Sequence, residues 1–327
     1  MDETGFIHAL QALATHDAAR GLADDCAVLE FGGEALVLTQ DTLVEGVHFP
    51  AGWDNPADIA WKVVAVNLSD LAAKGARPVG ILLSHALGKG DDRFLDGLGE
   101  ALARYDVPLI GGDTVAMPEG AARSWTITAL GRATHLPVPS RAGAKPGDAI
   151  WLVGRIGDAY RGFDLLGEER RRALLGLPPS DRPVPRENDF VQAYLRPEPL
   201  IEEGIALAPH ASAMMDVSDG LLLDLSRIAR ASGVTCVLDD HAVPMDEGWF
   251  GPSREADEAE GFAAVREGLL RWGDDYALLF TAPPDAELPL EAARIGVVTK
   301  AGKHPLLYAS TGEPPDEPLG YTHDPTD

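Results

Sequence analysis

Six aspartates of this sequence stand where a carboxylate can bind a metal ion or a phosphate-bearing ligand. They are Asp25, Asp41, Asp70, Asp113, Asp216 and Asp219. Asp70 lies on a predicted helix and the others at a predicted strand end or in a tight turn, and open α/β sheets place their ligands at strand ends. Carboxylates with few Cys or His neighbours suit hard cations, and Mg²⁺ takes one or two of them together with waters and substrate phosphates. If the six converge, metal ions must neutralise their repulsion, which predicts a site for several metal ions and a phosphate group.

Residues 38–49 bring a carboxylate and an imidazole into one short stretch. The apolar run that ends at Thr39 predicts a strand, Asp41 follows it, and Gly46 makes a turn two residues before His48. We therefore expect Asp41 and His48 at one rim of a sheet.

Two of the acidic segments also have a purely structural explanation. Asp24 and Asp25, taken alone, are typical of a solvated turn that feeds a strand. Asp70 and Lys74 are spaced i,i+4, a pair worth roughly 0.3–0.5 kcal/mol on an exposed helix. However, Asn67 and Asp70 lie in a segment rich in Ala and Val, where a polar group usually has a partner.

The third acidic segment precedes a predicted helix at residues 221–230. Ser218 or Asp219 would serve as the helix N-cap, worth about 1 kcal/mol. A cap accounts for one polar residue, whereas Asp216, Ser218 and Asp219 together exceed what a cap needs.

The elements that would position these residues follow from hydrophobic periodicity. Helices are predicted at residues 5–14, 56–75 and 94–105 (with Leu95, Leu98 and Leu102 inward), from residue 200, and at residues 221–230. Strands are predicted at residues 34–39, 79–87 (fully buried), 107–110, 124–130, 149–153, 234–239, 276–281 and 295–299. This mixture predicts an α/β or α+β fold. Turn formers at residues 141–148 suggest a boundary between domains 1–140 and 141–327, and the charged, proline-rich residues 168–188 suggest an exposed connection.

Length and composition restrict the protein class. The 327 residues suffice for about two domains of ordinary size. A net charge of −25 argues against a nucleic-acid partner, because phosphate backbones are bound by Lys and Arg. The chain has no long apolar run and no basic start of a signal peptide, so we expect a cytoplasmic protein without membrane association. The two cysteines, Cys26 and Cys236, are expected to pack as buried thiols.

Common nucleotide-binding signatures are absent. Gly88 and Lys89 lack the spacing of a P-loop, and no strand is followed by G-x-G-x-x-G. The residues alone therefore predict a soluble two-domain α/β protein with Mg²⁺-phosphate chemistry.

Seven segments, in order along nearly the whole chain, resemble the thiamine-monophosphate kinase family of the aminoimidazole-ribonucleotide-synthetase-like ATP-binding superfamily. They are ADDCAVL (23–29), DTLVEGVHF (41–49), VNLSDLAA (66–73), GGDT (111–114), RAGAKPGD (141–148), DVSDGL (216–221) and GDDY (273–276). Any one segment is a weak signal, and seven in order are a strong one.

The resemblance implies ATP-dependent phosphorylation of thiamine phosphate to thiamine diphosphate by a homodimer. It implies an N-terminal ATP- and Mg²⁺-binding domain whose sheet forms a barrel across the dimer, and a C-terminal domain that covers the nucleotide. The implied ligands of several Mg²⁺ ions are Asp25, Thr39, Gln40, Asp41, Asp70, Asp113, Asp216 and Asp219, of which Asp41, Asp70 and Asp216 are catalytic. The implied ATP contacts are Gly112, Asp113, Arg141 and Ser218, and the implied contacts to thiamine phosphate are His48, Asp274 and Tyr321.

This sequence departs from the family pattern in three places. Ala23 replaces a glycine, and Gln40 replaces a hydroxyl residue, so that a metal bond there would use the main-chain carbonyl. The usual Glu-Asp-Tyr-Glu is Asp274-Asp275-Tyr276-Ala277.

Two other functions fit parts of the sequence. A sister enzyme, such as a hydrogenase-maturation or selenophosphate-type ATPase, would carry a reactive Cys or a tail. A non-catalytic metal- or nucleotide-binding protein would use the acidic residues only to bind cations.

Overall fold

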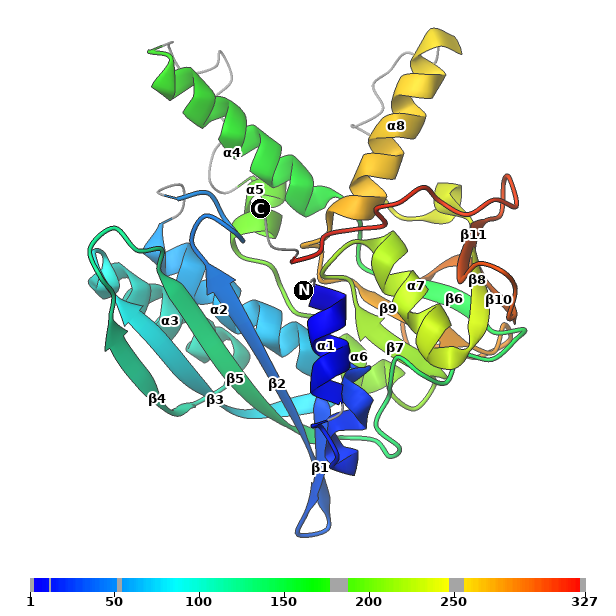
Figure 1. Ribbon diagram of the computed structural model, residues 1–327, viewed down its shortest axis with the longest axis horizontal. Coiled ribbons are helices and arrows are strands. Elements are labelled where there is room, and N and C mark those ends of the chain that lie inside the picture. The colour runs from blue at the N-terminus through cyan, green and yellow to red at the C-terminus, as the bar shows by residue number, and fades with distance from the viewer. Residues whose placement is uncertain (1–2, 12, 52–54, 177–187, 247–255, 324–327) are drawn as a thin grey trace. The chain divides into compact units, whose positions relative to one another are not determined.

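The computed structural model describes residues 3–11, 13–51, 55–176, 188–246 and 256–323. The chain divides into two compact units. The N-terminal unit comprises Ile7–Ser140 and Leu195–Pro209, and the C-terminal unit comprises Met1–Phe6, Arg141–Tyr194 and His210–Asp327. Each unit has its own sheet and its own apolar core (Figure 1). The expected two-domain α/β architecture is therefore present.

The N-terminal unit is built on a five-stranded mixed sheet in the order β1-β2-β5-β3-β4, in which only the β3–β4 pair is parallel. Its strands are β1 (Ala27–Phe31), β2 (Glu34–Val44), β3 (Ala76–Leu87), β4 (Leu109–Ala116) and β5 (Ser124–Ala133). Its helices are α2 (Pro56–Ala72), α3 (Asp91–Tyr105), α6 (Ile201–Leu207) and the 3₁₀ helix Asp17–Leu22, and α1 (Glu3–Gln11) leads into it.

Helix α2 is the central helix of this unit. Asn55 caps it by accepting a hydrogen bond from the Ala57 N–H, and Pro56 stands at its start, where a missing N–H costs nothing. Nearly every residue from Ala57 to Ala72 is buried, because α2 packs on β2 and β5 with one face and on α3 and α6 with others. The predicted helix at residues 56–75 is thus confirmed, with its end at Ala72.

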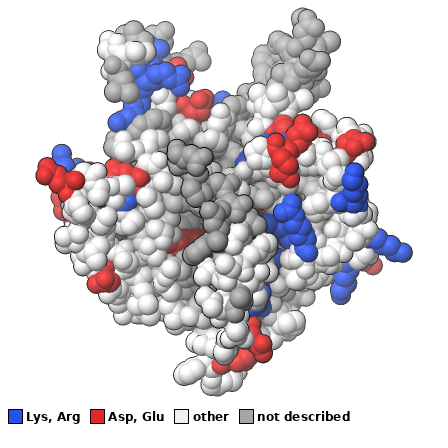
Figure 2. Space-filling model, in the orientation of Figure 1, with Lys and Arg blue, Asp and Glu red and all other residues white. Residues whose placement is uncertain are grey.

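The other face of the five-stranded sheet is open within this unit, since α2 and α3 both lie behind it in Figure 1. All eight residues of β4 are exposed. Exposed large apolar side chains on β3 and β4 are Val79, Leu82, Leu87, Leu109, Ile110 and Val115. Figure 2 shows few charged side chains over this sheet. The prediction of a fully buried strand at residues 79–87 is wrong, because only one face of β3 is covered.

The C-terminal unit is built on a six-stranded mixed sheet in the order β11-β8-β10-β6-β9-β7, in which only the β11–β8 pair is parallel. Its strands are β6 (Ala149–Val153), β7 (Ala213–Asp216), β8 (Val234–Leu238), β9 (Leu278–Ala282), β10 (Ala293–Lys300) and β11 (Leu306–Tyr308). Its helices are α4 (Asp158–Leu174), α5 (Asp189–Leu195), α7 (Leu221–Ser232), α8 (Ala256–Trp272) and the 3₁₀ helix Asp240–Ala242.

Several local predictions need correction. Residues 168–174, expected in an exposed connection, form the end of α4, and residues 177–187 lie outside the described part. Leu95 was expected to face inward but is 64% exposed, because α3 turns Phe94, Leu98 and Ala101 inward instead. Strand β4 extends through Gly112 and Asp113 rather than ending at residue 110. Both cysteines are buried, as expected.

No helix within the described residues combines the length and apolar character needed to cross a membrane.

Candidate active site

The Asp24–Asp25 turn of the N-terminal unit is held by buried charges. Both carboxylate side chains are only 2% exposed, so the interpretation as a solvated turn is wrong. Lys74, completely buried, places its Nζ 2.7 Å from Asp24 Oδ1 and also pairs with Asp25 Oδ2. Arg20 donates to the second oxygen of Asp24 at 2.6 Å and to the carbonyl oxygens of Val138 and Pro139.

Mutual attraction keeps Lys74 and Asp24 ionised. Burial by itself would raise the pKa of the Asp24 carboxyl, but the charge of Lys74 and its hydrogen bond outweigh burial and hold that pKa well below its usual range. Burial would likewise lower the pKa of Lys74, yet the charges of Asp25 and Asp24 hold it above its usual value. Asp24 and Lys74 therefore stay charged across the physiological pH range.

Asp70 lies beside this turn. One carboxylate oxygen of Asp70 and one of Asp25 lie within 4.8 Å of each other. Buried Thr39 of β2 hydrogen bonds to Asp70 Oδ2, and its hydroxyl lies 3.5 Å from the Asp25 carbonyl oxygen. Asp25, Thr39 and Asp70, predicted from separate segments, are thus brought together by the contact of α2 with the start of the sheet.

Asp41 is positioned by α2. Its backbone N–H donates to Oδ1 of Asn67 at 2.9 Å, while the Asn67 amide donates to the Val63 carbonyl oxygen. The expectation that the polar residues of this apolar helix have partners is confirmed for Asn67. Side chains alternate along a strand, so Asp41 shares the face of Thr39, which α2 covers.

Gln40 lies on the opposite face of β2. Its side-chain oxygen accepts a hydrogen bond from Thr128 of β5 at 2.8 Å. The structure therefore places the Gln40 side chain away from Asp25 and Asp70. The main-chain carbonyl is then the group of Gln40 that could bind a metal ion there.

Gly112 and Asp113 are exposed residues within β4 rather than in a loop after it. Gly112 has φ = +153°, and a Cβ there would stand 1.9 Å from the Leu83 carbonyl oxygen. The close approach of β3 therefore requires glycine at this position. Asp113 pairs in register with Ser84.

The His48 turn follows β2. The His48 Nδ1 accepts a hydrogen bond from the Val44 N–H at 2.9 Å, and the Gly46 N–H donates to the Phe49 carbonyl oxygen. Phe49 anchors the turn by packing on Trp125. Because Nδ1 accepts, the neutral ring carries its hydrogen on Nε2.

In the C-terminal unit, the turn between β7 and α7 is organised around Asp224, a residue inside α7. The N–H groups of Ser218 and Asp219 each donate to Asp224 Oδ2 at 3.1 Å. Arg227 donates to Asp224 Oδ1 at 2.7 Å and to Asp219 Oδ2 at 2.6 Å. Gly220 stands at the N-cap position without a side-chain bond, so the N-cap interpretation of Ser218 or Asp219 is wrong.

Two further predicted site residues of this unit border the same turn. Asp216 is buried at the end of β7. Arg141 is held by its main chain, since the Ser232 hydroxyl of α7 donates to the Arg141 carbonyl oxygen at 3.2 Å, and its charge acts on both Asp224 and Arg227. Burial raises the pKa of the Asp224 carboxyl, and the charge of Arg227 opposes that rise.

The loop of residues 273–276 packs against the β7–α7 turn. The Asp274 N–H donates to the Ser218 carbonyl oxygen and the Tyr276 N–H to that of Val217, both at 2.8 Å. Asp274 and Tyr276 adopt positive φ values of 63° and 51°, an uncommon conformation for residues with side chains. The Tyr276 hydroxyl bonds to Asp274 Oδ1 at 2.7 Å, which fixes the direction of that carboxylate.

The segment that carries Tyr321 also joins this turn, through a Tyr321 N–H bond of 3.0 Å to the Asp219 carbonyl oxygen. The Tyr321 side chain is exposed. In the C-terminal unit the structure thus gathers Asp219, Asp274 and Tyr321 around one turn, although they are far apart in sequence.

Three residues that hold these groups were not predicted as site residues. Lys74 was interpreted as a surface partner of Asp70, whereas it is buried against Asp24 and Asp25. Asp224 and Arg227 lie inside a predicted helix, where their i,i+3 spacing is typical of an exposed pair. A polar residue on the apolar stripe of α7 was the available signal for Asp224, which is buried among Leu221, Leu225 and their neighbours.

The donor set in the N-terminal unit fits a hard divalent cation. Asp25 and Asp70 offer two carboxylates at close range and Thr39 a hydroxyl, all of them oxygen donors. Cys26, the adjacent soft donor, is buried, its thiol donates a weak hydrogen bond to the Asp70 carbonyl oxygen at 3.7 Å, and burial raises the pKa of that thiol.

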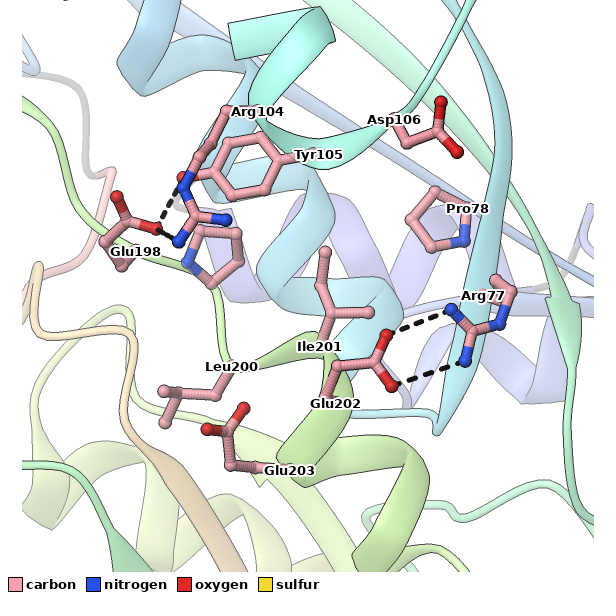
Figure 3. Close-up of a pocket in the computed structure, with 11 residues that line it drawn as sticks. Arg77, Pro78, Arg104, Tyr105, Asp106, Glu198, Leu200, Ile201, Glu202 and Glu203 are labelled. Atoms are coloured by element: carbon pink, nitrogen blue, oxygen red, sulfur yellow. Dashed lines mark hydrogen bonds and ion pairs between the residues drawn. The ribbon is translucent and has the colours of Figure 1, made fainter.

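A separate cavity of about 570 Å³ lies in the N-terminal unit (Figure 3). Both arginines of its lining form ion pairs, Arg77 with Glu202 at 2.9 Å and Arg104 with Glu198 at 3.3 Å. None of the predicted site residues lines it.

Two family models match the chain. The "AIR synthase related protein, N-terminal domain" matches residues 23–133, and the "AIR synthase related protein, C-terminal domain" matches residues 145–308. The thiamine-monophosphate kinase of Salmonella typhimurium is 37% identical over 275 residues, which cover 82% of this chain and 77% of that protein. This chain belongs to the thiamine-monophosphate kinase family. The Bacillus subtilis member is 31% identical, with 94% of each chain covered.

A solved structure described as AaThiL complexed with AMPPCP and TMP has the same fold. It superposes with a TM-score of 0.81 at 28% identity, covering 98% of this chain and 97% of that one. The two-domain architecture of the family is therefore shared along nearly the whole length.

Proposed function

We propose that this chain transfers the γ-phosphoryl group of ATP to thiamine phosphate and forms thiamine diphosphate. The likeness to AaThiL complexed with AMPPCP and TMP carries this proposal, because AMPPCP is a non-hydrolysable ATP analogue and the likeness spans both units. The names of the curated relatives support the same activity.

The proposed roles are divided between the two units. Ligands of several Mg²⁺ ions would be the side chains of Asp25, Thr39, Asp41, Asp70, Asp113, Asp216 and Asp219, with the main chain of Gln40. ATP would contact Gly112, Asp113, Arg141 and Ser218. Thiamine phosphate would contact His48, Asp274 and Tyr321. The proximity of Asp25, Thr39 and Asp70 in one unit, and of Ser218, Asp219 and Asp274 in the other, supports these assignments.

Transfer to a phosphate acceptor requires little general acid–base catalysis from the protein. The attacking phosphate oxygen is already ionised at neutral pH, so no strong general base is needed, and catalysis rests on positioning and charge neutralisation. Bound Mg²⁺ would supply the neutralisation of charge between donor and acceptor phosphates. The Asn67 bond would fix the backbone of Asp41, and the Thr39 bond would hold the carboxylate of Asp70 in place.

His48 would position the acceptor. Its Nδ1 is engaged by the Val44 N–H, so the ring would present Nε2–H as a donor to a phosphate oxygen. We propose direct in-line transfer from ATP, and trapping of a phosphorylated enzyme after exposure to labelled ATP would contradict it.

The open face of the five-stranded sheet supports a homodimer in which two such sheets meet and form a barrel. Its exposed apolar residues, among them Leu82, Ile110 and Val115, are costly to leave in water. Sedimentation equilibrium should give twice the chain mass, and a charge at Leu82 should shift it to the monomer.

Release of ADP that depends on added thiamine phosphate tests the function. A sister ATPase would release ADP without thiamine phosphate, and a non-catalytic binding protein would release none. Absence of ADP release with Mg²⁺, ATP and thiamine phosphate all present would refute the kinase assignment.

A further inference from the structure

Lys74 is a buried lysine in direct contact with a proposed metal ligand, Asp25. It follows the end of α2, is 0% exposed, and pairs with both Asp24 and Asp25. A buried ammonium must be compensated by charge, and two carboxylates do so here. Its partner Asp25 is at the same time one of the two carboxylates that lie within 4.8 Å of each other.

The neighbouring charges show which carboxylate serves as the anchor. Asp24 accepts from Arg20 through Oδ2, from Lys74 through Oδ1, and from the Asp25 N–H through Oδ1 at 3.0 Å. Arg20 therefore balances Asp24, and Asp24 fixes the ammonium in place. The positive charge of Lys74 then acts on Asp25, whose carboxylate lies beside that of Asp70.

We propose that Lys74 is a built-in cation of the carboxylate site, a positioning residue that holds Asp25 in place and weakens the binding of divalent metal ions in the absence of nucleotide. The inference rests on the proposed metal role of Asp25 and Asp70. A fixed ammonium bound to one oxygen of Asp25 repels a divalent ion on the same carboxylate. Tight metal binding then requires the additional negative charge of the nucleotide phosphates, which couples metal binding to ATP binding.

Direct measurement of Mn²⁺ binding tests this without any turnover. Mn²⁺ is titrated into the full chain and followed by the electron paramagnetic resonance signal of the free ion, with neither ATP nor thiamine phosphate present. The variant Lys74→Met keeps the length of the side chain and removes the charge. We expect it to bind Mn²⁺ at least about tenfold more tightly, because a cation at contact lowers the affinity of a carboxylate for a proton by roughly 10- to 1000-fold.

Two further variants separate charge from packing. Lys74→Arg retains the charge and should keep the native affinity. Lys62→Met removes a buried lysine inside α2, twelve positions earlier in the chain, and should also keep the native affinity. Equal or weaker Mn²⁺ binding by Lys74→Met would overturn the proposal.

A folding failure of Lys74→Met would not prevent the test, because crystals of the native chain soaked in Mn²⁺ provide a second one. The anomalous peak should lie on Asp25 and Asp70 with the Lys74 ammonium still bound to Asp25. Displacement of the ammonium by the ion would overturn the proposal. Absence of thiamine-phosphate-dependent ADP release would refute the proposed function alone, since neither Mn²⁺ experiment contains substrate.

Discussion

Substitution of Asp224 by alanine should destabilise the C-terminal unit and disorganise the turn between β7 and α7. The carboxylate is completely buried and accepts three hydrogen bonds, from the Ser218 N–H, the Asp219 N–H and Arg227. Removing one partner of a buried ion pair costs about 3–5 kcal/mol. Water can replace part of the loss at Ser218 and Asp219, which are partly exposed, so we expect a total of about 3–5 kcal/mol.

Urea denaturation followed by circular dichroism measures this cost, and ADP release measures its effect on the turn. Because Ser218 and Asp219 are proposed ATP and metal contacts, kcat/KM for ATP should fall in the same variant. Asp224→Asn retains an oxygen that can accept both N–H groups but turns an amide NH₂ toward Arg227, which keeps Asp219 as a partner, so its cost should be smaller, about 1–3 kcal/mol.

An aspartate of the same unit provides the matched control. Asp246 pairs with Arg155 at 3.1 Å, but both side chains are partly exposed, at 28% and 47%. Exposed ion pairs contribute about 0–1 kcal/mol, so Asp246→Ala should unfold nearly like the native chain. A cost for Asp224→Ala as small as that of Asp246→Ala would refute the organising role of Asp224.

Three further predictions concern the N-terminal unit. Asp41→Asn should abolish turnover while circular dichroism and thermal unfolding stay native, and normal turnover would remove Asp41 from the metal site. Gly112→Ala should lower the unfolding temperature clearly, because its Cβ would stand 1.9 Å from the Leu83 carbonyl oxygen, and a native melting curve would show that β3 and β4 can separate without cost. The lowered pKa of Asp24 adds stability that is present above the ordinary carboxyl value of 3.8 and is lost as the pH falls below it. The free energy of unfolding should therefore fall less steeply with acid in Asp24→Asn than in the native chain, and equal slopes measured by urea denaturation between about pH 5 and 3 would contradict this.

The local signals in the sequence were sufficient for much of the fold. Helices α2 and α7 were predicted because their apolar residues recur with helical spacing, and a glycine follows each near its end, Gly75 and Gly233. Strand β5 was predicted because Trp125, Ile127 and Ala129 alternate with polar residues and are all buried. Such patterns act over a few residues, so a sequence shows them directly.

The sequence by itself therefore determined that Asp25 and Asp219 stand in turns and that Asp216 ends a strand, since strand and turn signals are local. Asp41 and Asp113 were predicted at strand ends but lie inside β2 and β4, because pairing with neighbouring strands extends both elements. Only the tertiary structure decided what those carboxylates contact. The spacing of Asp70 and Lys74 suggested a surface pair, but burial of the C-terminal end of α2 directs Lys74 to a turn about fifty residues earlier in the chain. Likewise, Asp224 serves a turn of its own unit because α7 is buried on the side that faces it. A buried polar group takes whichever partner the packing of distant segments provides, and a local pattern does not record that partner.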